Sequence, residues 1–166
     1  LNAVLYLDPH YNNQVCKGAS KGCKQSCLIN SGRMIMESAV NARQNRTAYY
    51  FNDREMFTMT LQGEIAALLY KATKQGKRLA MRLNGTSDLD WSSIYKAFPT
   101  VQFYEYTKRP DLAKKLNKIE NVHITFSKHE NHSELNVKKL LASGVNVAVV
   151  FNKEVPANYI NITVID

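Results

Sequence analysis

The chain has 166 residues, of which 45% are hydrophobic and 22% charged; these values fit one domain with its own core and exclude a disordered or low-complexity chain. No apolar run approaches the roughly 18 to 20 residues that cross a bilayer, so we expect no membrane association. The net charge of +8 favours anionic partners, either nucleic acid or small molecules that carry phosphate or carboxylate groups.

The first half of the chain holds one predicted strand and two predicted helices. Residues 1–7 form an apolar strand, and a loop at residues 13–32 follows it and contains every cysteine. Apolar residues then recur at steps of three and four, which predicts helices over residues 36–50 and 53–75. A helical insertion at residues 36–76 therefore separates the first strand from the second.

The second half alternates strands with helices. Predicted strands occupy residues 78–85, 101–108, 122–128 and 145–151, with a further candidate at residues 160–165. Predicted helices lie between them, over residues 88–98, 109–119 and 132–144. Successive βα units specify right-handed crossovers and a parallel sheet, so we expect a single α/β domain over residues 1–166. We favour a partial TIM-barrel-like arrangement, and an open doubly wound sheet is the alternative.

Polar side chains gather where the predicted strands end. Parallel strands bring their carboxyl ends to one edge, which is where ligands bind in such folds. We expect the following residues to line a site for a small anionic ligand there: Arg82, Asn84, Asp88, Lys108, Ser127 and His129. Arg82 either binds the anion or pairs with Asp88 or Asp90. No catalytic residue is assigned.

The three cysteines lie in the stretch CKGASKGCKQSC, residues 16–27. An odd count argues against a disulfide framework, and polar neighbours argue against burial in a core. Cys16, Cys23 and Cys27 are therefore predicted metal ligands. Positive charge favours the thiolate that binds metal, and we expect this effect from the intervening lysines, Lys17, Lys21 and Lys24.

Three cysteines suit an iron–sulfur cluster better than a zinc ion. Structural zinc takes four protein ligands, so a histidine such as His10, His129 or His132 would have to complete a zinc site. A [4Fe-4S] cluster held by three cysteines keeps one iron open to another ligand. The cluster is the favoured cofactor, and zinc remains the alternative.

A cysteine loop after the first strand of a βα barrel resembles the cluster loop of radical S-adenosylmethionine enzymes. The spacing here is C-x6-C-x3-C, whereas those enzymes usually have C-x3-C-x2-C. Where they carry a glycine-rich stretch near the second strand, this chain has RLNGTSDLDW. The resemblance implies S-adenosylmethionine as a possible second cofactor.

Several motifs together resemble one bacteriophage family, known as gene product eighty-eight. They are CKGASKGCKQSC with SGRM, ARQNRTAYYF, RLNGTSDLDW, VQFYEYTKRP and VHITFSKHEN, which span most of the chain from residue 13 to residue 152. The resemblance implies a phage-encoded protein in the host cytoplasm, with cysteines that hold an iron–sulfur cluster.

Two classes of function follow. In the first, the protein binds a [4Fe-4S] cluster through three cysteines and acts as a redox enzyme like the radical S-adenosylmethionine enzymes. In the second, an iron–sulfur or zinc site is structural or senses redox state, and the basic surface binds nucleic acid; no helix-turn-helix, zinc-finger or RNA-recognition signature supports this reading beyond charge. A simple electron carrier is a third, weaker possibility, because small ferredoxins do not need a barrel.

Overall fold

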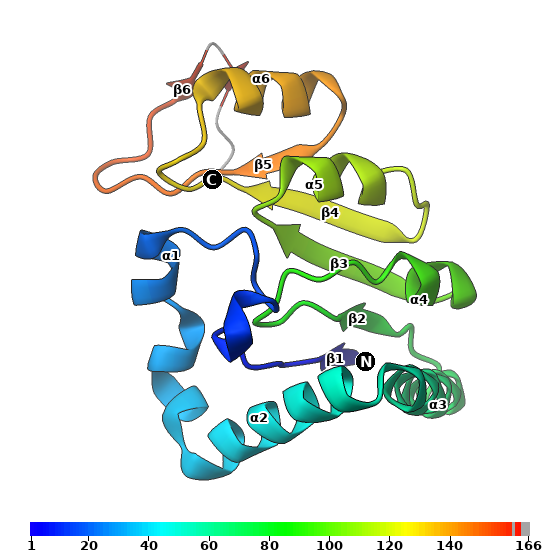
Figure 1. The fold of residues 1–166 in the computed structure, drawn as a ribbon. Helices are drawn as coiled ribbons and strands as arrows, with labels where there is room; N and C mark the ends of the chain where they lie inside the picture. The colour runs from blue at the N-terminus through cyan, green and yellow to red at the C-terminus, as the bar shows by residue number, and fades with distance from the viewer. Residues whose placement is uncertain (161, 164–166) are drawn as a thin grey trace.

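A parallel sheet of five strands forms the centre of the computed structural model, which describes residues 1–160 and 162–163. The strands lie in chain order, β1-β2-β3-β4-β5 (Figure 1). They are β1 (Asn2–Val4), β2 (Ala80–Arg82), β3 (Gln102–Thr107), β4 (Val122–Ser127) and β5 (Asn146–Ala148). The register pairs Ala3 with Met81, Met81 with Phe103 and Phe103 with Val122. The predicted parallel sheet of successive βα units is confirmed.

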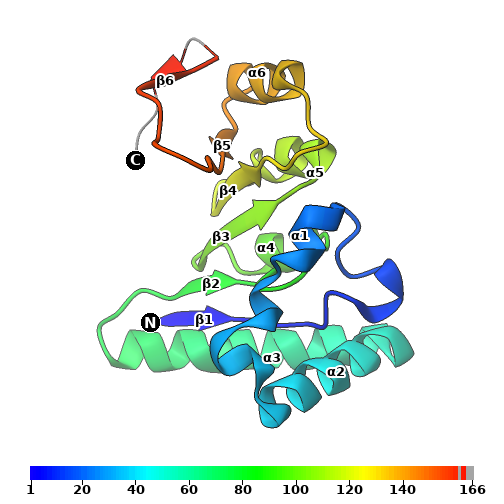
Figure 2. The same cartoon turned by 90° about the vertical axis from the view of Figure 1, so that its left-hand side faces the viewer.

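The two faces of the sheet differ because side chains alternate along each strand. In β3, Phe103, Glu105 and Thr107 are buried, whereas Gln102 and Tyr106 are exposed. β4 repeats the pattern, with buried residues at every second position. Figure 2 shows α4 (Ser92–Ala97), α5 (Pro110–Leu116) and α6 (Glu134–Ala142) on the same side of the strands. The helices therefore cover one face, and the other face of β2, β3 and β4 is open.

Two long helices, α2 (Glu37–Asn52) and α3 (Arg54–Lys74), lie beyond β1 (Figure 2). The carboxylate of Asp53 accepts a hydrogen bond from the Met56 N–H, which caps the start of α3. Phe57, Leu61 and Ile65, at steps of four, are buried in the core. Gly76 ends this segment with φ of 61°, a left-handed conformation that glycine adopts without strain.

The elements agree with their predicted positions, and most are shorter than predicted. The predicted helix at residues 88–98 begins only at Ser92, because residues 84–91 form a loop fixed by side-chain hydrogen bonds. A five-residue helix within the cysteine loop, α1 (Lys21–Gln25), was not predicted. The predicted strand at residues 160–165 is represented by β7 (Ile162–Thr163), which pairs antiparallel with β6 (Asn158–Tyr159); positions 161 and 164–166 lie outside the described residues.

The described strands form an open sheet and do not close into a barrel. β1 and β5 are its two edges, and neither pairs with the other in the part of the chain that the structure describes. The expected closure of a TIM-barrel-like ring is therefore not seen, since five short strands leave the two edges apart. Within the described residues, no helix has the length and apolar character needed to cross a bilayer.

Candidate functional site

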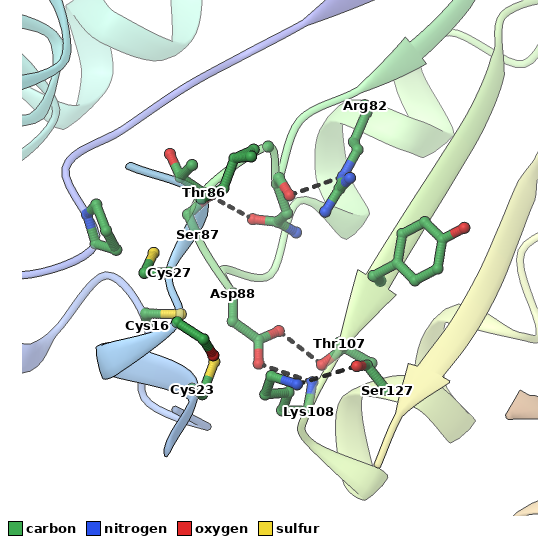
Figure 3. Close-up of a pocket in the computed structure, with 16 residues that line it drawn as sticks. Cys16, Cys23, Cys27, Arg82, Thr86, Ser87, Asp88, Thr107, Lys108 and Ser127 are labelled. Carbon is green, nitrogen blue, oxygen red and sulfur yellow. Dashed lines mark hydrogen bonds between the residues drawn. The ribbon is translucent and has the colours of Figure 1, made fainter. Parts of the chain in front are cut away.

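A cavity of about 420 Å³ lies at the carboxyl ends of β2, β3 and β4. Figure 3 shows the three cysteines on one side of it and strand residues on the other. Five of the six predicted ligand-binding residues line it, namely Arg82, Asn84, Asp88, Lys108 and Ser127. The cysteine loop and these five residues therefore border the same cavity.

The cysteine loop is tied to the sheet by backbone hydrogen bonds. The Asp88 N–H donates to the carbonyl of Val15 at 2.9 Å, directly before Cys16. The Gly22 N–H donates to the Glu130 carboxylate at 3.1 Å, which links the loop to the segment after β4. A β-carbon on Gly18 would lie 2.8 Å from Oδ2 of Asp88, so the loop packs too closely there for a larger residue.

The position of each sulfur follows from local structure. Cys23 lies in α1, whose first turn is capped by Ser20: the Cys23 N–H donates to the Ser20 hydroxyl at 3.2 Å. Cys27 directly precedes a short 3₁₀ turn at Leu28–Asn30. All three cysteines are half-buried free thiols.

Two of the three thiols, Cys16 and Cys23, have a raised pKa. Burial raises the pKa of Cys16 to about 12, and the nearby Asp88 carboxylate adds to this effect. Burial also raises the pKa of Cys23, although Lys108 acts in the opposite direction. The expectation that neighbouring lysines favour thiolates is therefore wrong for both groups, because desolvation outweighs positive charge. Binding of a metal would have to displace these protons.

Asn84 organises the loop through both ends of its side-chain amide. Its Oδ1 accepts hydrogen bonds from Ser87 Oγ, Leu89 N and Trp91 Nε1, at 2.8, 3.0 and 3.1 Å. Its Nδ2 donates to the Leu89 carbonyl at 2.9 Å. Although Asn84 borders the cavity, its side chain serves the structure.

Asp88 is a buried carboxylate beside the sulfurs. It accepts hydrogen bonds from Thr107 Oγ1 at 2.6 Å and from the Lys108 N–H at 3.1 Å. Burial raises its pKa, and these two hydrogen bonds oppose that shift. Asp88 therefore joins the end of β3 to the loop after β2.

Arg82 and Lys108 are the cations of the cavity. Arg82 Nε donates to the carbonyl of Asn84 at 3.0 Å, and its guanidinium lies 4.9 Å from the ring centroid of Tyr106. Lys108 Nζ donates to Ser127 Oγ at 3.0 Å. In the described part of the chain, the only ion pairs are Arg109 with Asp111 and Lys115 with Asp90.

The expected pairing of Arg82 with Asp88 or Asp90 is consequently absent among the described residues. Asp88 is engaged by Thr107 and Lys108, and Asp90 by Lys115 and Ser92. Arg82 keeps its two terminal nitrogens available, and these form a fork that matches a carboxylate or phosphate.

His129 is the one predicted ligand-binding residue outside the cavity lining. Its ring lies 3.7 Å from that of His132, centroid to centroid. Burial lowers the pKa of both imidazoles. The pair belongs to the segment that holds the cysteine loop through Glu130.

Two residues of this region lie outside the predicted set of site residues. Glu105 is 1% exposed and accepts hydrogen bonds from Leu83 N, Asn84 N and Tyr95 Oη, at 2.7, 3.1 and 2.9 Å. Burial raises its pKa to about 7. The sequence carries a signal for Glu105. Residues two positions apart in a strand face the same side of the sheet, so Glu105 shares the buried face with Phe103. The second residue, Tyr106, borders the cavity and carries Arg82 on its ring.

The three thiols around the cavity are donors of the kind that an iron–sulfur cluster would need. Three thiols supply the donor atoms that such clusters use, and all three face one space. No three His, Cys, Asp or Glu side chains within the described ranges converge closely enough to hold one metal ion. A cluster of four irons is wider than one ion, so it accepts sulfurs spread around a cavity.

These features define an α/β protein with a thiol-lined and cationic cavity at the carboxyl edge of a parallel sheet. The chain belongs to the Gene product 88 family, whose model matches residues 1–166. This confirms the family resemblance read from the motifs. Neither the curated proteins nor the solved structures gave a significant match.

Proposed function

We propose that this protein binds a [4Fe-4S] cluster through Cys16, Cys23 and Cys27, and that the iron without a cysteine ligand faces a small anion in the cavity. The observation that carries the proposal is the shared cavity, with three sulfurs on one wall and two cations on the other. When bound, a cluster of this kind supplies an electron and a free coordination position. Zinc at the same cysteines is the alternative cofactor.

The other residues of the cavity bind and orient the ligand. Arg82 offers a two-pronged hydrogen-bond donor, and Lys108 is held toward Ser127 as a second positive charge. Asp88 and Asn84 fix the loops that carry these groups. The partner is therefore a small carboxylate or phosphate compound, and the cytoplasm of an infected host is the proposed location.

The finer proposal is a redox enzyme that uses S-adenosylmethionine as this anionic ligand, in keeping with the placement of the cysteine loop. The chain would supply orientation and charge, while the cofactors carry the electron chemistry. With dithionite as the source of one electron and a C–H compound as the donor of one hydrogen atom, the loaded protein should then cleave the bond between the sulfur and the 5′ carbon of S-adenosylmethionine, giving methionine and 5′-deoxyadenosine. If neither product forms, the proposed enzyme class is wrong, whereas the proposed cluster site is unaffected by that result.

Iron and sulfide analysis of protein purified without oxygen tests the cluster directly. We expect about four irons and four sulfides per chain and a brown colour. Each of the variants Cys16→Ser, Cys23→Ser and Cys27→Ser should lose most of the iron, because two thiolates hold a cubane poorly.

The control for this measurement is Ser26→Ala, which alters the same loop without touching a sulfur. Its hydroxyl donates only to the Gly22 carbonyl, at 2.8 Å, so the variant should keep its iron. Colourless protein with one zinc per chain, lost in the same three cysteine variants, would contradict the cluster and favour zinc.

A further inference from the structure

The open face of the sheet carries a row of polar and aromatic side chains. They come from the three central strands and are Arg82, Tyr104, Tyr106, His123, Thr125 and Ser127. We refer to these six residues as the open face. Helices pack on the opposite side of the strands (Figure 2). On the open face, Tyr106 and His123 are exposed and the other four side chains are half-buried.

Stacking groups are the first notable property of this face. Tyr106 is 44% exposed although it lies in the middle strand of the sheet. The guanidinium of Arg82 lies over its ring, and His123 is exposed on the next strand. Rings and guanidinium planes on a sheet surface are platforms on which nucleic-acid bases stack.

Charge is the second property. None of the six residues is acidic, because Glu105, the one acid of β3, points into the buried face. Lys108 follows β3 at the carboxyl edge, where Arg82 is also placed. Arg82 on the face and Lys108 at its edge outnumber Asp88, the one acid that lines the cavity there, and on a chain of net charge +8 they attract a polyanion.

We propose that the open face binds single-stranded nucleic acid, with a base stacked on Tyr106 and Arg82 and backbone phosphates directed toward Lys108. The face has few apolar side chains, so a protein partner would bury little hydrophobic surface there. Paired bases cannot lie flat on a sheet, whereas unpaired bases can. Arg82, Tyr106 and Ser127 of the open face, and Lys108 at its edge, also line the cavity beside the cysteines, so a bound strand would compete with the proposed small anion for Arg82 and Lys108.

Fluorescence anisotropy with a labelled single-stranded oligonucleotide of mixed sequence tests the proposal. Tyr106→Val keeps a strand-forming residue and removes the ring, so it should weaken binding by roughly 5-fold to 150-fold. Tyr106→Phe keeps the ring and should bind like the wild-type protein.

The chain offers a matched control in Tyr70. This tyrosine is 62% exposed on α3, and Lys74 lies over its ring at 4.8 Å, so it combines a ring with a stacked cation away from the open face. Tyr70→Ala should leave the affinity unchanged. Equal losses in Tyr70→Ala and Tyr106→Val would overturn the proposal, as would unaltered binding in Tyr106→Val.

Further binding measurements distinguish base stacking from attraction by charge alone and from binding of a small ligand. The same DNA as a duplex should bind more weakly than the single strand, and equal binding would show attraction by charge alone and overturn the proposal. Displacement of the oligonucleotide by a mononucleotide at equal nucleotide concentration would also overturn the proposal, because the site would then bind a small ligand. Iron content measured on the Tyr106→Val protein distinguishes failure of this proposal from failure of the cluster, because Tyr106 is not a proposed cluster ligand and the variant should keep its iron.

Discussion

The two faces of the central sheet use polar side chains in opposite ways. On the buried face, every oxygen of Glu105 accepts at least one hydrogen bond, from Leu83 and Tyr95 on one side and from Asn84 on the other. On the open face, Arg82 donates through Nε to the Asn84 carbonyl, and no residue that the structure describes accepts a hydrogen bond from its two terminal nitrogens. Both faces belong to strands only a few residues long.

Because of this difference, the polar groups of the buried face contribute to stability and those of the open face are available for binding. A buried carboxylate is tolerated only when its hydrogen bonds are satisfied, so Glu105 can serve the structure and little else. A cation that still reaches solvent costs little to leave without an acidic partner, so the half-buried Arg82 and Lys108 remain available to a ligand. Substitutions on the two faces should therefore affect different measurements.

The largest effect on stability is expected from Glu105→Ala. The variant leaves two backbone N–H groups and the Tyr95 hydroxyl in the core without their hydrogen-bond acceptor. Each unsatisfied donor costs roughly 1 to 3 kcal/mol, so the free energy of unfolding should fall by about 3 kcal/mol or more. Urea unfolding followed by circular dichroism measures this.

Glu120→Ala is the control, because Glu120 is exposed and its loss should change the free energy of unfolding by less than about 0.5 kcal/mol. Similar values for the two variants would contradict the structural role assigned to Glu105.

A pH dependence should also come from the buried face. Burial raises the pKa of Glu105 from 4.5 to about 7, so the folded protein holds this proton more tightly than the unfolded chain. The contribution to stability is therefore complete below about pH 4.5, declines as pH rises, and is lost above about pH 7. The slope is at most about 1.4 kcal/mol per pH unit.

Glu105→Gln mimics the neutral acid and removes the titration. The difference in unfolding free energy between the wild type and this variant, measured at several values across that window, should reproduce the slope. A difference that is constant with pH would show that Glu105 does not titrate there.

The smallest effect on stability is expected on the open face. Arg82→Gln removes one hydrogen bond and a contact with the Tyr106 ring, so the free energy of unfolding should change by less than about 1 kcal/mol. The same variant should weaken the binding of single-stranded DNA in the anisotropy measurement. If Arg82→Gln lowered the free energy of unfolding as much as Glu105→Ala, the assignment of different roles to the two faces would be wrong.

Local sequence patterns determined the order of the elements. Alternation in VQFYEYTK and VHITFSK and the steps of three and four in residues 53–75 are local signals, and they predicted β3, β4 and α3 correctly. The parallel sheet followed from the spacing of strands and helices, and the shared edge of Cys16, Arg82 and Lys108 followed from the parallel sheet.

Contacts between distant residues decided the rest. The late start of α4 depends on Asn84 bonding to Leu89 and Trp91, and the neutral state of Cys16 depends on burial against Asp88. Neither effect has a local signature, because desolvation and long-range hydrogen bonds arise only after the chain has folded. The sequence by itself thus determined which groups meet at the carboxyl edge. Only the tertiary structure decided which of these groups are engaged in hydrogen bonds within the protein and which remain available to a ligand.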